Sequence, residues 1–116
     1  MSRIGKLLSA LAVAAVVSAA WLWWSAGAAP ERAPRRHVVE IRGFQFVPPA
    51  LEVAVGDTIV WVNRDFVPHT ATAANGGWDS SEIARDGTWS YVVRERGRHE
   101  YFCALHPTMA ASFTAE

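Results

Sequence analysis

The sequence has one cysteine, no internal repeat and, after residue 30, no stretch with the long 3.6-residue apolar period of a helix. A single cysteine excludes an internal disulfide, and it excludes a c-type haem attachment, which needs the pattern Cys-x-x-Cys-His. Structural zinc sites usually take more cysteines and histidines at paired spacings. Because a free exposed thiol is readily oxidised, an exported Cys103 is expected to be either buried and inert or occupied as a metal ligand.

An excess of charge of either sign is also absent. The chain has 11 basic and 11 acidic residues, and its formal net charge is zero. Proteins that bind nucleic acid normally show a basic excess or a basic stripe. The composition therefore indicates no nucleic-acid partner, and the length of 116 residues suits one domain at most.

The N-terminal segment, residues 1–28, is typical of an export signal. Arg3 and Lys6 precede the uncharged and mostly apolar residues 7–24, and small residues follow. The alternative is a retained membrane-anchor helix, because this apolar run is at the lower limit for crossing a bilayer. In both cases we expect the rest of the chain to be exported to the periplasm. Residues 29–36 contain two prolines and three arginines, and this composition predicts a linker.

From residue 37 onward, short runs rich in β-branched and aromatic residues alternate with turn signals. The predicted strands are residues 37–43, 51–55, 58–63, 88–93 and 98–103. Leu51, Val53 and Val55 are expected on one face of the second of these strands. Many short strands with turns at close spacing predict an all-β fold, a β-sandwich or small barrel, over residues 37–116.

One short stretch near the C-terminus carries most of the chemistry. Cys103, His106 and Met109 lie within seven residues, which we expect on a loop between the last two strands. Thiolate and thioether are soft ligands that suit copper, and two histidines and one cysteine with a weak axial methionine describe an electron-transfer copper site. The stretch supplies one histidine, so a second is needed. His69, which follows Pro68 at the end of an apolar strand, is the candidate.

Each of these residues also has an explanation without a metal. Cys103 could be a small buried apolar residue and Met109 a core side chain, and either histidine could belong to an ordinary loop. A Cys–His hydrolase would use the same cysteine and a histidine, but it would leave Met109 and the short spacing unexplained. We interpret the joint pattern as a site for one copper ion. The remaining histidines, His37 and His99, are expected to be solvent-exposed.

Four stretches of the sequence resemble the cupredoxins, a family of blue copper proteins. They are residues 43–48, 55–65, 68–69 and 101–109. The spacing Cys-x-x-His-x-x-Met in the last stretch resembles the amicyanins within this family. The resemblance covers residues 38–116 and implies a Greek-key β-sandwich. It also implies that His69, Cys103 and His106 form the plane of the copper site, with Met109 as the axial ligand.

The sequence departs from the family's pattern beside the ligands. Thr70 stands where the family often has Asn, and Ala104 stands where it often has Thr or Ser. In the family those two side chains tie the ligand loops together, so this chain lacks the usual partners for the tie. The backbone N–H of Thr70 is still available to donate to the Cys103 sulfur.

The resemblance implies a monomeric periplasmic electron carrier that is not an enzyme and passes single electrons between redox proteins. These partners would dock transiently beside a partly exposed His106. The flanking apolar residues, which could instead pack within the loops, are Phe66, Val67, Pro68, Leu105 and Pro107. Membrane association is expected only if residues 1–28 are retained. The alternative function is copper binding or delivery without a redox partner, but delivery sites are often Met-rich and this chain has one methionine after residue 1.

Overall fold

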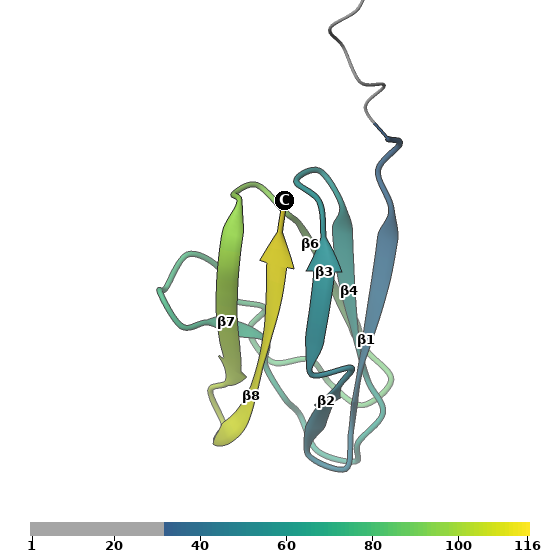
Figure 1. Ribbon diagram of the computed structural model, residues 1–116. Coiled ribbons are helices and arrows are strands. Elements are labelled where there is room, and N and C mark those ends of the chain that lie inside the picture. Colours follow the sequence, from purple (N-terminus) through teal and green to yellow (C-terminus); the bar gives the residue numbers. More distant parts are fainter. Residues whose placement is uncertain (1–31) are drawn as a thin grey trace, which may run out of the picture. The chain divides into compact units, whose positions relative to one another are not determined.

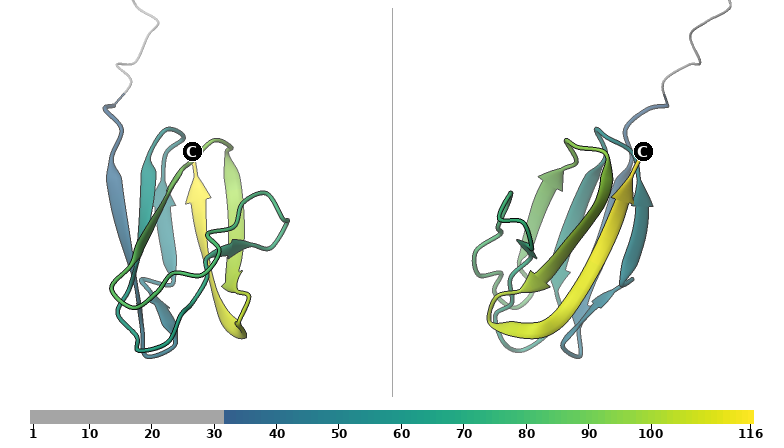
Figure 2. Two further views of the ribbon diagram at one scale, coloured as in Figure 1. Left: turned by 180° about the vertical axis from the view of Figure 1, so that it is seen from behind. Right: turned by 60° about the vertical axis from the view of Figure 1, so that its left-hand side comes forward.

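The computed structural model describes residues 32–116, and every regular element in this range is a β-strand. The strands are β1 (Arg36–Arg42), β2 (Gln45–Val47), β3 (Ala50–Val53), β4 (Thr58–Asn63), β5 (Thr72–Ala73), β6 (Thr88–Val92), β7 (Gly97–Cys103) and β8 (His106–Ala115). They form two four-stranded sheets, with the orders β2-β1-β4-β6 and β3-β8-β7-β5. The two sheets pack face to face (Figures 1 and 2), which confirms the predicted all-β sandwich.

The predicted signal or anchor, residues 1–28, and the first part of the predicted linker lie outside the described residues. Within residues 32–116, no helix has the length and apolar character needed to cross a membrane. The division of the chain into a leader, a linker and a folded domain stays a prediction.

Both sheets contain a parallel pair of strands that are distant in sequence. β1 is parallel to β4 in the first sheet, and β3 is parallel to β8 in the second. β2 turns back and pairs with β1 in antiparallel fashion, after which the chain crosses to the other sheet as β3. This crossing closes the sandwich, because it places the C-terminal strand beside a strand from the first half of the domain.

The core lies between the sheets and is rich in aromatic rings. Trp61 of the central strand β4 is fully buried, and its ring centroid lies 5.4 to 5.5 Å from those of Trp78, Trp89 and Tyr101. β-branched and aromatic residues favour strands because they pack well on a half-buried pleated surface. These rings fill the interior of a small domain that has no disulfide among its described residues.

The hairpin of β7 and β8 contains an irregularity at its closed end. The strands pair regularly as far as Phe102 and Ala110, and then the register shifts so that Cys103 pairs with His106. The expectation of a loop over the whole stretch from Cys103 to Met109 is therefore wrong. β8 already begins at His106, because a bulge-like irregularity lets the two strands continue to pair after the register has shifted.

Val55 also differs from its prediction. β3 ends at Val53, and the side chain of Val55 is 43% exposed instead of sharing a buried face with Leu51 and Val53. Val55 lies in the turn before Gly56, whose φ of 95° belongs to the left-handed region that glycine adopts without strain. The apolar alternation continues in the sequence beyond the point at which the strand stops.

The prediction that His37 is exposed is wrong. Its side chain is 19% exposed, and Nε2 lies 2.8 Å from Oδ2 of the buried Asp57. The Asp57 carboxylate also accepts hydrogen bonds from the backbone N–H groups of Arg35 and Ala54. A buried carboxylate is stable only when its oxygens are paired, and here the pairing joins the start of β1 to the turn before β4.

His99 is likewise only half-exposed. Its ring stacks on Phe113 with centroids 4.8 Å apart, and Nε2 lies 2.8 Å from the backbone oxygen of Glu95. The charged neighbours of His99 in sequence suggested full exposure. However, the alternation of β7 places His99 on the same face as the buried Tyr101, where the register puts it opposite Phe113 of β8.

Burial gives Tyr101 an unusual titration. It raises the pKa of this side chain to about 12, whereas a tyrosine in an unfolded chain ionises near pH 10. The native state therefore keeps a proton that the unfolded state loses. We expect the free energy of unfolding to keep its full value below about pH 10 and to fall by up to about 3 kcal/mol between about pH 10 and pH 12. Tyr101→Phe should remove this decline, which urea unfolding at stepped pH would measure.

The matched control is Tyr91→Phe, which changes the only other tyrosine, a half-buried residue of β6. This variant should keep the alkaline decline. A decline of the same size in Tyr101→Phe would mean that another group is responsible.

Candidate metal centre

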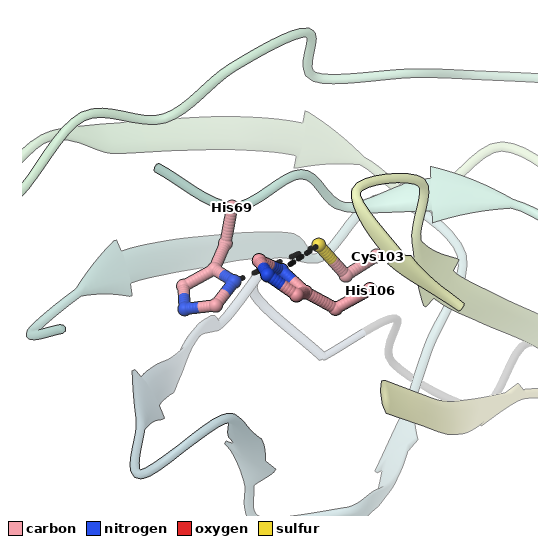
Figure 3. Close-up of side chains that lie close together, drawn as sticks. All are labelled: His69, Cys103 and His106. Carbon is pink, nitrogen blue, oxygen red and sulfur yellow. Dashed lines mark hydrogen bonds between the residues drawn. The ribbon is translucent and has the colours of Figure 1, made fainter. Parts of the chain in front are cut away.

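Three of the four predicted ligands converge at one end of the sandwich (Figure 3). His69 precedes β5, Cys103 ends β7 and His106 begins β8. Nδ1 of His69 lies 3.6 Å from Sγ of Cys103, and Nδ1 of His106 lies 3.8 Å from it. The three ligand atoms all lie within 4.8 Å of one another. Because nitrogen and sulfur ligands lie about 2.0 to 2.3 Å from a divalent ion such as zinc, the sulfur–nitrogen separations of 3.6 and 3.8 Å allow Cys103 to share one metal ion with each histidine.

The burial of the three residues is unequal. His69 and Cys103 are fully buried, whereas His106 is half-exposed. The cysteine is therefore protected from solution oxidants, and the cluster reaches solvent on the His106 side. Two imidazoles and one thiol are typical ligands of copper in proteins, whereas structural zinc sites usually have more cysteines.

Met109 lies in β8 and is 5% exposed, within the same buried cluster as Cys103. The regular pairing of Phe102 with Ala110 would, if continued, bring Met109 opposite Cys103. The register shift pairs His106 with Cys103 instead and leaves Met109 beyond the shift. Met109 therefore shares the buried cluster with Cys103 without being paired to it, and a thioether in this cluster suits a fourth and weaker ligand.

Asn63 organises the loop before His69. This fully buried side chain at the end of β4 donates from Nδ2 to the backbone oxygens of Val67 and Ile83, both at 2.9 Å, and accepts at Oδ1 from the N–H of Asp65. The backbone N–H and oxygen of His69 also pair with Ile83, at 3.2 and 2.7 Å. These hydrogen bonds fix the backbone of His69 without any contribution from a metal ion.

Sequence reasoning missed the partner of His69. Oδ2 of Asp65 lies 2.8 Å from Nε2 of His69, on the side of the ring away from the cysteine. Burial raises the pKa of Asp65, but hydrogen bonds from Phe44, Gly43 and His69 together bring this pKa below its ordinary value. The carboxylate is therefore ionised at neutral pH. Asp65 lies four residues before His69 in the sequence, but in a loop this spacing does not fix the distance between the two side chains.

Phe44 is a second residue that sequence reasoning did not place in the site. Its ring meets His69 and His106 edge to face, with centroids 5.1 and 5.0 Å away. Phe44 and Gly43 form the turn between β1 and β2, and both have positive φ, 57° and 59°. Asn and Gly usually occupy such positions. A bulky residue there is strained, so its placement against both imidazoles is a specific feature of this site.

The fold and the cluster agree with what is known of similar proteins. Amicyanin from Paracoccus denitrificans is 31% identical over 94 residues, which cover 77% of this chain and 72% of that protein. The family model of the cupredoxin-like domain matches residues 13–115. This chain belongs to the cupredoxin family.

Solved cupredoxin structures show the same fold. An oxidised mutant of amicyanin superposes with a TM-score of 0.65 at 29% identity, covering 70% of this chain and 82% of its own. A purple cupredoxin from Nitrosopumilus maritimus superposes with a TM-score of 0.63 at 26% identity, covering 69% of this chain and 99% of its own. The resemblance stated from the sequence is thereby confirmed.

The tie between the ligand loops is present in this cupredoxin, although its usual side chains are replaced. Oγ1 of Thr70 accepts a hydrogen bond of 2.7 Å from the backbone N–H of Ala104. The N–H of Thr70 donates to the Cys103 sulfur at 3.3 Å, as the sequence had suggested. One threonine therefore links both loops, and the lack of a hydroxyl at position 104 does not matter because that residue contributes its backbone.

Thr70→Val tests this tie, because it replaces the hydroxyl by a methyl group of similar size. We expect the metal-free protein to lose about 1 kcal/mol of unfolding free energy, since the part-buried N–H of Ala104 would lose its acceptor. Thr70→Ser, which keeps the hydroxyl, should lose less. Urea unfolding would measure both variants, and an unchanged free energy of unfolding in Thr70→Val would show that the hydrogen bond does not stabilise the loops.

Proposed function

We propose that this cupredoxin holds one copper ion with His69, Cys103 and His106, that Met109 is a weaker fourth ligand, and that the protein carries single electrons. The convergence of two imidazole nitrogens on the Cys103 sulfur is the observation that supports this most directly. Copper bound by this set supplies one-electron chemistry, and thiolate with imidazole and thioether is the donor set of blue copper sites.

The protein's contribution is to hold its ligands still. His69 is held by Ile83 and Asp65, and the sulfur of Cys103 receives the N–H of Thr70. A site whose ligands are already in place needs little rearrangement when its charge changes, so the barrier to electron transfer is low. Such a site has no need of a substrate pocket, and we infer a carrier and not an enzyme.

Copper delivery is the competing function. A delivery protein needs ligands that release the metal, and the buried, hydrogen-bonded His69 and Cys103 argue against easy release. We further propose that the carrier is monomeric and works in the periplasm, with residues 1–28 serving as its signal or anchor.

Partners would dock where His106 reaches the surface. The five apolar residues predicted to flank this histidine are all exposed, and we call them the ligand-loop patch: Phe66, Val67, Pro68, Leu105 and Pro107. Phe66 is 82% exposed, and the guanidinium of Arg85 lies 4.3 Å from its ring centroid. A small apolar patch beside a redox centre suits brief docking with a weak interface.

The first test is the visible spectrum on addition of Cu(II) to the purified protein. We expect an intense blue colour, because the Cys103 thiolate would donate charge to the metal. Cys103→Ser should abolish this colour. A wild-type protein that binds Cu(II) without an intense visible band would refute the assignment.

Met109→Leu is the informative companion variant in the same experiment. It should keep the copper and an intense colour but shift the reduction potential, because only the weak ligand is lost. Complete loss of copper would contradict the minor role proposed for Met109. Reversible voltammetry of the wild type would favour a carrier, whereas tight binding of only one oxidation state would favour delivery.

Leu105→Glu tests the ligand-loop patch without knowledge of a partner, since two copies can exchange an electron with each other. Like charges that face each other across an interface cost several kcal/mol, so we expect self-exchange to slow by about tenfold or more. Val92→Glu is the matched control: Val92 is similarly exposed, at the end of β6 that pairs with the start of β4. NMR line broadening in mixtures of oxidised and reduced protein would measure the self-exchange rate. Equal slowing in both variants would show that the two copies do not meet through the ligand-loop patch.

A further inference from the structure

We propose that Asp65 is a positioning residue that selects which nitrogen of His69 faces the metal and that lowers the reduction potential of the site through its negative charge. This inference rests on the proposed copper site. It assigns a role to a side chain that is not itself a ligand.

The hydrogen bond between His69 and Asp65 has a defined direction. Nε2 of His69 lies 2.8 Å from Oδ2 of Asp65, and Nδ1 lies 3.6 Å from the Cys103 sulfur. An ionised carboxylate can only accept hydrogen bonds, so Nε2 carries the proton. Nδ1 of the neutral ring then keeps its lone pair free on the side of the cluster. A carboxylate behind a ligating histidine orients the ring and raises its basicity in this way.

Asp65 is itself held in place by three further hydrogen bonds. Its Oδ1 accepts from the N–H of Gly43 at 2.7 Å, and its Oδ2 accepts from the N–H of Phe44 at 2.9 Å. Its own N–H donates to Oδ1 of the buried Asn63. The carboxylate is thus held by the β1–β2 turn on one side and by the end of β4 on the other, and the orientation of His69 follows from two rigid elements.

The bonds from Gly43 and Phe44 to Asp65 also hold Phe44. They stabilise a turn in which Phe44 has a φ of 57°, a conformation that a bulky residue seldom adopts. The ring of Phe44 is thereby placed edge-on against His69 and His106. Asp65 therefore connects the buried imidazole, the turn and the ring that covers both histidines.

The charge of Asp65 has a further consequence. The side chain is 12% exposed and His69 is fully buried, so little water screens the pair. A negative charge transmitted through the ring makes His69 a stronger donor and favours the more highly charged oxidation state of a bound metal. Removal of the charge should therefore raise the reduction potential.

The first experiment uses the metal-free protein and nitrogen-detected NMR of His69 at mildly alkaline pH. We expect a single form with the proton on Nε2 in the wild type, and a mixture of the two neutral forms in Asp65→Ala. A proton on Nδ1 in the wild type, or a single unchanged form in Asp65→Ala, would overturn the positioning role.

The second experiment compares copper-loaded variants. Asp65→Asn should raise the reduction potential and weaken Cu(II) binding by about 10- to 100-fold, as is usual when the partner of a ligating histidine is lost. Glu95→Gln makes the same change of charge in the β6–β7 connection, at the opposite end of the sandwich from the cluster (Figure 1), and should do neither. Asp65→Glu, which keeps the carboxylate, should lie nearer to the wild type in potential. Equal potentials in Asp65→Asn and Glu95→Gln would overturn the role of the charge.

The two proposals fail differently. A wild-type protein without the blue band would refute the copper site, whereas a blue wild type with an unaltered potential in Asp65→Asn would refute this inference alone. If Asp65→Asn does not fold, the wild-type NMR result and the potential of Asp65→Ala carry the test.

Discussion

The pairing of Cys103 with His106 at the closed end of the β7–β8 hairpin is the constraint on which the site depends. Regular pairing would have brought Cys103 opposite Met109, and the register shift exchanges that neighbour for a histidine. Because β7 lies between β8 and β5 in its sheet, the shifted end also lies beside the chain that carries His69. One local irregularity thus gathers ligands from two distant parts of the sequence.

Buried and part-buried polar groups surround this point, and their hydrogen bonds go to the backbone of the ligand loops or to a ligand. These groups are Asn63, Asp65 and Thr70. An unpaired polar group would be costly in such surroundings, so each bond restricts the loops to one arrangement. The aromatic core around Trp61 supplies the rigid support. Rigidity at the ligands is what a one-electron carrier requires.

The predictions from the sequence were correct where they depended only on residues close together in the chain. Cys103 and His106 were recognised from their spacing, and β4 was predicted with its observed bounds from a run of β-branched and aromatic residues. The predictions failed where the decisive contact was distant. His37 was taken as exposed because its partner Asp57 is 20 residues away, and Val55 was assigned to a strand that ends before it. Asp65 and Phe44 were missed because a loop spacing and a strained turn have no periodic signature.

The sequence by itself determined the kind of site and the class of fold: a lone cysteine with nearby histidine and methionine, in a chain of short strands. Ligand identity is a property of residue type, and strand formation is a property of local pattern, so both can be inferred without coordinates. Only the tertiary structure decided which nitrogen of each histidine faces the sulfur, that Asp65 stands behind His69, and that Thr70 ties the loops. These depend on strand register and on loops that meet across the sheets, and the physical interactions that set them act between residues far apart in the chain.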